Sequence, residues 1–503
     1  MKREFVNPIY GGQDPFVCKG PDGRYYGVAE SADSRQIEVF DSDRLTDRGV
    51  RRVVYQAAES GPSSADLWAP ELWYLRGKWY IYYAGASAPG TSSWETHRMY
   101  VLEADTPLGP YRFAGPLDLG EYMSIDGTVM ELPDGGLIFF YMRKYRGVNT
   151  IFMAPMSSPT RISGEPVLLS KPDHPWEADI NEGPFPIVRK GRVSLMYAAN
   201  AAHLPQYCLA LIHCTDPGRI LDPSVWVKEP EPILAGQGDV IGPGHACIVS
   251  SPDGREDYLL FHSKFDRDCT LPGGWNRVVN LLKMTWNEQQ RPVFDPLPAM
   301  GEPRRLPSGE RSLPEGGRLS LELGTASDHL AEFGYYRSQT IFYEPEGLRI
   351  RGTACPEYGD KVMLRDGLWK DFEAEVELEP LAGECGVLFR VQLPAARQYL
   401  WHGCGLYISG GTWRLVRCNG KRLAELAQGE ITGGSQMVVN VYARGRELRL
   451  RLNGAEVCNV TTDWNDWGQI GFGTLNGEGR FVRMSVRPLD QNGVQPRNRR
   501  IFP

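Results

Sequence analysis

The chain has 503 residues, more than one ordinary hydrophobic core accommodates, so at least two domains are expected. Its formal net charge is −7, and no Lys/Arg block precedes the short "RNRR" near the C-terminus. This charge balance argues against nucleic acids and anionic membranes as partners.

The first residues, "MKREFVNPIYGGQDPF", contain no apolar run that is long enough for a signal peptide or a membrane span. The sequence therefore predicts a cytoplasmic protein. Its 10 cysteines are scattered singly without a CxxC pair, a pattern that indicates neither a zinc site nor a redox motif.

Short runs of alternating apolar and polar residues recur along the first 300 residues, among them "KWYIYYAG", "GLIFFYM", "RVSLMYAA" and "DYLLFHS". Turn residues separate them, and the chain as a whole contains 56 Gly and 38 Pro. Long helical periodicity is hard to find. The pattern predicts an all-β protein.

A conspicuous polar segment precedes each of these runs, and a fifth such segment opens the chain. The five anchor residues of these segments lie 54, 58, 56 and 63 residues apart, and they are Asp14, Trp68, Asp126, Glu182 and His245. A repeat of this size favours a radial array of small antiparallel sheets, here a five-bladed β-propeller over residues 1–297. The innermost strands of a propeller start at one mouth of its channel, so the anchors would converge there. A sandwich with similar hairpins is the alternative.

Two aspartates, a glutamate, a histidine and a tryptophan at one mouth suit the cleavage of a glycosidic bond. Single displacement needs an acid to protonate the leaving oxygen and a base to activate water, with the two carboxyl groups roughly 6.5–9.5 Å apart. The acid must keep its proton well above the pKa of a free glutamate, which is about 4.3. Burial or a neighbouring negative charge supplies such a shift.

In this order and spacing, the segments "QDPFV", "WAPE", "SIDGT", "NEGP" and "GPGH" resemble motifs of glycoside hydrolase family 43, the inverting five-bladed β-propellers. The resemblance covers roughly residues 5 to 297. It implies that Asp14 is the general base, that Glu182 is the general acid, and that Asp126 orients the acid and raises its pKa. Taken singly, each of the three could be an ordinary turn or loop carboxylate.

The resemblance also implies three residues around the substrate. Trp68 would stack on a sugar ring, with a place in the core as the alternative. Arg277 would reach the substrate near the acid pair, and its alternative is a surface salt bridge. His245 resembles a histidine near the channel axis that contacts a central cation, often calcium, although calcium prefers oxygen ligands and a structural or substrate-side role is the alternative. The chemistry itself requires no cofactor. Glu71 stands where the family frequently has aspartate.

A segment rich in Pro, Gly and charge predicts a linker over residues 298–318. Residues 319–503 then show alternating strands with turn signals such as "NG", which predicts a β-sandwich of the jelly-roll kind. This part resembles the concanavalin/laminin-G-like sandwiches appended to family 43 enzymes. Such a module binds carbohydrate or packs on the propeller, and the lack of a clear row of exposed aromatic residues favours an architectural role. Trp401, Trp413 and Trp464 are expected in the core or between domains.

Together these features imply an inverting, exo-acting glycoside hydrolase that releases terminal pentosyl residues from oligosaccharides. Family frequency places α-L-arabinofuranosidase first, with β-D-xylosidase or dual activity as the alternative. A catalytically inactive carbohydrate-binding propeller is the hypothesis from another class, and a related five-bladed family acting on other sugars is a third. The oligomeric state is left open.

Overall fold

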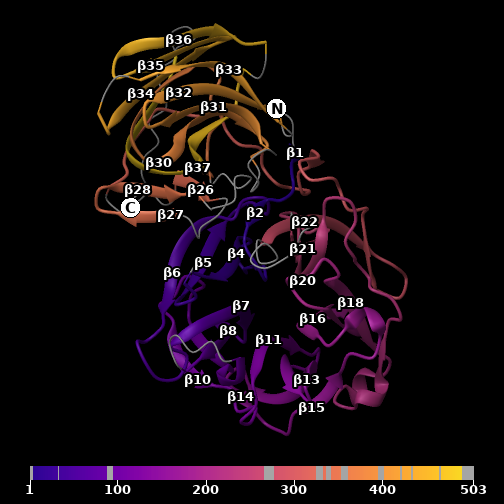
Figure 1. Ribbon diagram of the computed structural model, residues 1–503. Coiled ribbons are helices and arrows are strands. Elements are labelled where there is room, and N and C mark those ends of the chain that lie inside the picture. The colour runs from indigo at the N-terminus through magenta and orange to yellow at the C-terminus, as the bar shows by residue number, and fades with distance from the viewer. Residues whose placement is uncertain are drawn as a thin grey trace. The chain divides into compact units, whose positions relative to one another are not determined.

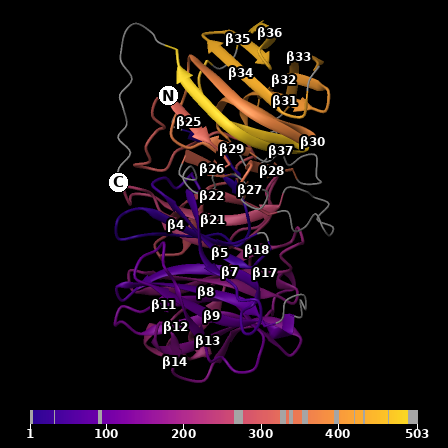
Figure 2. The ribbon, with the colours of Figure 1, turned by 90° about the vertical axis from the view of Figure 1, so that its left-hand side faces the viewer.

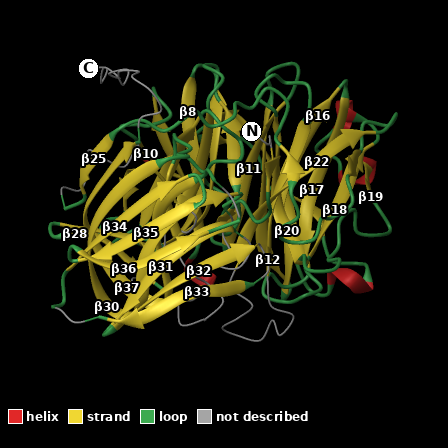
Figure 3. Ribbon diagram, turned by 90° about the horizontal axis from the view of Figure 1, so that it is seen from above, coloured by secondary structure: helices red, strands yellow, loops and turns green. Residues whose placement is uncertain are grey.

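The computed structural model describes residues 4–31, 33–87, 94–264, 277–324, 332–335, 341–352, 361–394, 401–419, 422–431, 434–463 and 466–489. Strands dominate these residues, and the helices among them are short 3-10 turns (Figure 3): η1 (Trp94–Thr96), η2 (Pro175–Glu177), η3 (Pro217–Arg219) and η4 (Pro223–Val225). The all-β prediction is thus confirmed. No helix in the described ranges combines the length and apolar character needed to cross a membrane.

The chain divides into two compact units, of which the first comprises residues 12–300 and 307–310. The second comprises residues 1–11, 301–306 and 311–503. The predicted boundary at 297 lies close to residue 300, the end of the first unit's long segment, and residues 1–11 cluster with the second unit. The reason is strand pairing, because β1 (Glu4–Phe5) pairs antiparallel with β24 (Arg304–Arg305) of the same unit.

Five antiparallel sheets follow one another along the first unit, and the first three strands of each pair in chain order. The first sheet contains β3 (Phe16–Lys19), β4 (Tyr25–Glu30), β5 (Gln36–Ser42) and β6 (Val50–Gln56), and the second contains β7 (Ala65–Leu75), β8 (Lys78–Ala86), β9 (Arg98–Ala104) and β10 (Arg112–Pro116). The third contains β11 (Ser124–Glu131), β12 (Leu137–Tyr145), β13 (Val148–Ser158), β14 (Arg161–Ile162) and β15 (Val167–Ser170). The fourth contains β16 (Asn181–Arg189), β17 (Arg192–Ala199), β18 (Cys208–Cys214) and β19 (Trp226–Lys228), and the fifth contains β20 (Ile241–Ser250), β21 (Asp257–Lys264), β22 (Arg277–Trp286) and β23 (Pro292–Phe294).

The first strands of these sheets form a closed ring. Figure 1 shows the sheets arrayed around a common centre, with β7, β11, β16 and β20 closest to it. Each of the five first strands contacts the next, and β20 contacts β3 to complete the ring. This arrangement is a five-bladed β-propeller, which confirms the predicted fold of the first unit.

Apolar side chains fill the space between neighbouring blades. One buried cluster joins the second and third blades through residues such as Tyr82, Met99 and Phe139. Another joins the third and fourth through residues such as Phe140 and Tyr197. These side chains come from the alternating runs of the sequence, because each blade is covered on both faces by its neighbours. The packed blades therefore hold the ring of first strands in place.

The second unit contains one connected sheet of 13 strands built around two very long strands, β30 (Phe372–Gln392) and β37 (Gln469–Pro488). Figure 2 shows these two strands running side by side as long curved arrows. The first half of β30 also pairs with β34, and its second half pairs with β31, so one strand contributes to both layers of a sandwich. The other strands are β25 (Leu319–Glu322), β26 (Phe333–Tyr335), β27 (Ile341–Glu344), β28 (Gly347–Arg351), β29 (Lys361–Leu364), β31 (His402–Ser409), β32 (Thr412–Asn419), β33 (Leu423–Glu430), β34 (Met437–Arg444), β35 (Glu447–Leu452) and β36 (Ala455–Thr461). The unit's residues also include the short β2 (Tyr10–Gly11).

Alternation along β30 explains the sandwich core. Its first half reads "FEAEVELE", in which Phe372, Ala374, Val376 and Leu378 are buried while the glutamates between them are half-buried. Trp401 and Trp413 are buried, as expected for core residues, and Trp464 lies outside the described residues. The predicted β-sandwich is confirmed as the fold of this unit.

Candidate active site

The backbone of the propeller's first strands is irregular where the anchor residues sit. The strand register shifts between Ile125 and Thr128 in β11 and between Glu182 and Phe185 in β16, and β7 and β20 carry similar shifts. Such bulges re-aim side chains and are frequent at active sites. Asp14, Asp126 and His245 have φ values of 43°, 55° and 41°, in the left-handed region that residues other than glycine rarely adopt. Register shifts and left-handed backbone conformations are thus found repeatedly at the candidate site.

Asp14 lies just before β3, beside the Arg277 guanidinium and two histidine rings. Its Oδ1 is 3.0 Å from Nη1 of Arg277 and 3.2 Å from Nδ1 of both His245 and His262. Burial acts to raise the pKa of the Asp14 carboxyl, but Arg277, His245 and His262 outweigh it and hold the pKa well below its usual range. Asp14 is therefore ionised at neutral pH.

Glu182 is buried in β16, and its pKa is shifted in the opposite direction from that of Asp14. Burial raises the pKa of its carboxyl to about 7, and the negative charge of Asp14 adds to the increase. The hydroxyl of Tyr207 donates a hydrogen bond of 2.8 Å to Oε1 and opposes the shift. A carboxyl with this pKa retains a proton near neutral pH, which is what a general acid requires.

Asp126 is buried beside the strand that carries Glu182. Its Oδ2 accepts a hydrogen bond of 3.0 Å from the backbone N–H of Gly183. Burial raises the pKa of Asp126 to about 7, and the charges of Glu182 and Asp14 raise it further while His245 opposes them. Burial is therefore the leading cause for both raised carboxyls. The charge of Glu182 adds to the pKa of Asp126, whereas the charge that adds to the pKa of Glu182 is that of Asp14.

Two glycines let the backbone approach the rings of this site. Gly183 has a φ of 51°, and a Cβ there would lie 2.9 Å from the ring of His245. A Cβ at Gly244 would lie 2.0 Å from the ring of Tyr207. The Gly-Pro step after Glu182 therefore both turns the strand and makes room for the histidine.

The structure brings together residues that the sequence analysis missed. Tyr207 stacks on His262 with ring centroids 5.4 Å apart and connects that ring to Glu182. His262 accepts a hydrogen bond of 3.1 Å from the backbone N–H of Asp14, and burial lowers its pKa to about 3, so it is neutral. Both residues sit in ordinary strand patterns, in "YCLAL" and "DYLLFHS", and no local motif marks them.

Trp68 and Arg277, which the sequence predicts to contact the substrate, both contact other side chains of the propeller. Trp68 is partly buried, packs on the core between the second and third blades, and stacks on the ring of His97 at a centroid distance of 4.1 Å. Arg277 is buried against Asp14 and also donates to the side chain of Gln13. Arg277 does form a salt bridge, but with side chains that are only 8% and 13% exposed. Contact of either residue with substrate stays a prediction.

The calcium role suggested for His245 stays a prediction. Nδ1 of His245 faces the Asp14 carboxylate, where it suits a hydrogen bond. Within the described ranges, no group of three or more His, Cys, Asp or Glu side chains is placed to hold a metal ion. Calcium prefers six to eight oxygen ligands.

Glu71 is a further buried carboxyl on β7, and its Oε2 accepts a hydrogen bond of 2.8 Å from Nε1 of Trp73. Burial raises the pKa of Glu71 to about 8. The raised pKa means that this group's contribution to stability is complete below its ordinary pKa of about 4.5 and is lost as the pH rises through about 8.

We expect Glu71→Gln to flatten the alkaline loss of stability, because the amide cannot ionise. The melting temperature of the wild type should fall more between pH 6 and pH 9 than that of the variant, as measured by calorimetry. Glu59→Gln is the control, since Glu59 is exposed. Equal pH dependence in all three proteins would contradict the assignment.

The strand that carries Glu182 is anchored by an ion pair just upstream. The fully buried Glu177 accepts hydrogen bonds of 2.8 Å from Asn181, Tyr197 and Lys228. Burial acts to raise the pKa of Glu177, but Lys228 and backbone N–H donors lower it to about 2. Asn181 directly precedes Glu182, so this cluster fixes the start of β16.

Lys228→Met should destabilise the propeller by about 3 kcal/mol, because it leaves the buried Glu177 charge without its cation. Urea denaturation followed by tryptophan fluorescence measures the change. The double variant Glu177→Gln/Lys228→Met, which removes both charges, should recover part of the loss. An unchanged midpoint in the single variant would show that the pair contributes nothing.

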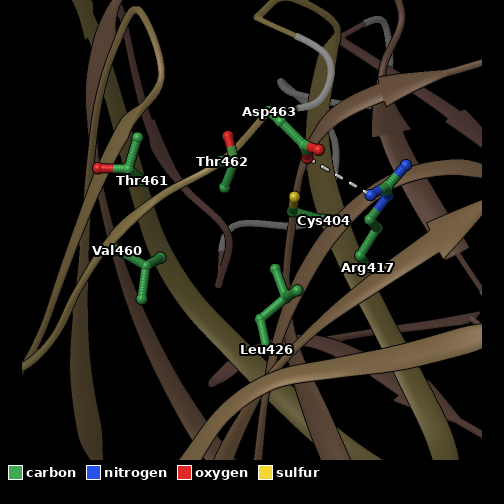
Figure 4. Close-up of a pocket in the computed structure, with 7 residues that line it drawn as sticks. All are labelled: Cys404, Arg417, Leu426, Val460, Thr461, Thr462 and Asp463. Carbon is green, nitrogen blue, oxygen red and sulfur yellow. Dashed lines mark ion pairs between the residues drawn. The ribbon is translucent and has the colours of Figure 1, made fainter.

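The second unit contains a small cavity of about 200 Å³ lined by Cys404, Arg417, Leu426, Val460, Thr461, Thr462 and Asp463 (Figure 4). Arg417 and Asp463 form an ion pair across it at 3.7 Å. None of these lining residues is aromatic, so the cavity lacks the ring face on which sugars stack. It supports no assignment of carbohydrate binding to this unit.

The family model described as "Glycosyl hydrolases family 43" matches residues 5–292. The chain is 31% identical over 274 residues to an extracellular exo-alpha-(1->5)-L-arabinofuranosidase of Streptomyces chartreusis, covering 52% of this chain and 82% of that protein. It is 30% identical over 311 residues to alpha-L-arabinofuranosidase 43 of Humicola insolens, covering 58% of this chain and 63% of that protein.

Two solved structures share the fold. The alpha-L-arabinofuranosidase from Lactobacillus brevis aligns with a TM-score of 0.55 and 28% identity over 58% of this chain and 97% of that one. A GH43 protein from Bacillus licheniformis aligns with a TM-score of 0.53 over 97% of this chain and 100% of that one, at 16% identity. The second likeness concerns the fold alone.

Proposed function

This chain belongs to family 43 of the glycosyl hydrolases, and from that premise we propose that it removes terminal α-L-arabinofuranosyl residues from arabinose-containing oligosaccharides with inversion of configuration. Membership in the family makes it a glycoside hydrolase that acts on carbohydrate. The sugar, the linkage and the roles of individual residues are our proposals.

The mechanism is supported by two neighbouring carboxyls whose pKa values are shifted in opposite directions. Asp14 has a strongly lowered pKa because of its cationic neighbours, whereas burial raises that of Glu182 to about 7. Titratable groups that their surroundings push apart in this way serve as base and acid in one reaction. A propeller that only binds sugar has no use for this difference.

In the proposed reaction, Asp14 accepts a proton from a water molecule as the water oxygen forms a bond to the anomeric carbon. The glycosidic C–O bond breaks on the opposite face, and Glu182 donates its proton to the leaving oxygen. Asp126 holds the backbone N–H of Gly183 and thereby orients the strand of the acid. Water replaces the leaving group on the opposite face, so the released sugar has inverted configuration.

The relatives favour arabinofuranose as the sugar. The matched proteins of Streptomyces chartreusis and Humicola insolens are named arabinofuranosidases, the former with exo action on α-1,5 linkages. A structural neighbour named as a xylosidase is only 17% identical and bears on the fold alone. β-D-Xylosidase therefore remains the second candidate only through the family.

Hydrolysis of 4-nitrophenyl α-L-arabinofuranoside and 4-nitrophenyl β-D-xyloside tests this proposal. We expect the arabinoside to be the better substrate by at least tenfold in kcat/KM, and NMR of the first product formed should show the inverted anomer. A preference for the xyloside would change the sugar assignment. Binding of arabino-oligosaccharides without turnover would instead support the inactive binding propeller.

A further inference from the structure

A second polar patch lies beside the candidate active site, where the second and third blades meet. Ser124 at the start of β11 is paired across the strands with Arg143 near the end of β12. Asp126 follows Ser124 by two residues, so their Cα atoms are within about 7 Å of each other. The patch therefore starts at the same end of the blade as the proposed catalytic carboxyls.

Arg143 is a buried cation without a carboxylate partner in the part of the chain that the structure describes. It is 8% exposed, and its guanidinium carbon lies 3.2 Å from the ring centroid of Tyr122 and 4.7 Å from that of Phe152. Among the described residues no carboxylate forms an ion pair with it, and its buried Nε has no hydrogen-bond partner. Cation–π contacts and the Tyr141 hydroxyl offset only part of the cost of burying such a charge.

The two neighbours of Arg143 add a buried hydroxyl and an exposed aromatic ring. Ser124 is 1% exposed, and its buried Oγ also has no hydrogen-bond partner. Tyr122 is 53% exposed although its ring is held against the guanidinium. Sugars present both hydroxyl groups and an apolar ring face. An exposed aromatic ring beside unsatisfied polar groups matches both features.

Two buried contacts link the patch to Trp68. The backbone N–H of Ser124 donates a hydrogen bond of 3.1 Å to the carbonyl of His97, and the ring of His97 stacks on the Trp68 indole. The fully buried His97 thus connects Trp68 to Ser124 through the interior of the blade pair.

We propose that Tyr122, Ser124 and Arg143 form a binding subsite for the neutral sugar on the leaving-group side of the cleaved bond. The proposal rests on the proposed function, because that function defines which sugar reacts. The ring of Tyr122 supports the sugar face, and the edge N–H groups of Arg143 donate hydrogen bonds to its hydroxyls. The subsite would favour oligosaccharides over substrates whose leaving group is small.

Two substrates with different leaving groups test the subsite. α-1,5-Arabinobiose places a sugar there, whereas α-L-arabinofuranosyl fluoride has a leaving group of one atom. We expect Tyr122→Ala to lower kcat/KM for the disaccharide about tenfold, mainly through KM, and to leave the fluoride unchanged within about twofold. Tyr74→Ala is the matched control, since Tyr74 is an exposed tyrosine near the far end of β7.

Arg143→Lys provides a second variant that keeps the charge and loses the flat guanidinium, and it should show the same selective loss. Equal losses on both substrates in these two variants, or no loss on the disaccharide, would overturn the subsite while leaving the proposed function intact. Failure of the wild type to turn over either substrate would overturn the proposed function and the subsite with it.

Discussion

Glu182→Gln should reduce kcat/KM on arabino-oligosaccharides by a factor of about 10³, within the 10²–10⁴ range of general acid catalysis. The amide keeps nearly the same shape and can still accept the hydrogen bond from Tyr207, but it has no acidic proton to donate. The variant should fold normally. Steady-state kinetics on α-1,5-arabinobiose measure the loss.

The dependence on pH and on the leaving group identifies the acid. Because burial raises the pKa of Glu182 to about 7, wild-type activity on the disaccharide should fall as the pH rises through about 7 and the proton is lost. Asp126 titrates in the same range, so this limb belongs to the coupled pair. Glu182→Gln should retain most activity on a dinitrophenyl arabinoside, whose leaving group needs no proton. An equal loss on both substrates would contradict the role of general acid.

Asp14→Asn should cause a loss of about 10³ in kcat on every substrate, because the attack of water still needs a base when the leaving group is good. The carboxyl has a strongly lowered pKa, so it should remain ionised to the acidic end of the activity profile. Removing its negative charge should also lower the pKa of Glu182, since Asp14 contributes to that increase. The residual activity should therefore begin to decline at a lower pH than in the wild type.

Azide separates a missing base from a damaged fold in Asp14→Asn. The anion can attack the anomeric carbon without a base, so it should restore turnover of the dinitrophenyl arabinoside and yield the glycosyl azide of inverted configuration. Asp134→Asn on an exposed turn is the control for the substitution itself. Full activity of Asp14→Asn without azide would exclude Asp14 as the base.

Much of the fold could be predicted from local patterns. Alternating runs predicted strands, and the regular spacing of Asp14, Trp68, Asp126, Glu182 and His245 predicted five similar sheets around one channel. Both predictions concern features that repeat along the chain. The pairing of β1 with β24 joins segments some 300 residues apart, and no local signal announces it.

In the candidate site, too, local motifs predicted some features and only the tertiary structure decided the others. The sequence by itself determined which carboxyls are candidates for the channel mouth, because each lies within a short motif of adjacent residues. It could not determine their pKa values, which depend on burial and on charges from distant strands. Arg277 holds Asp14 ionised from 263 residues away, and Tyr207 reaches Glu182 from 25 residues away. Only the tertiary structure brings these groups within hydrogen-bonding distance, and it is there that one carboxyl becomes suited to act as a base and the other as an acid.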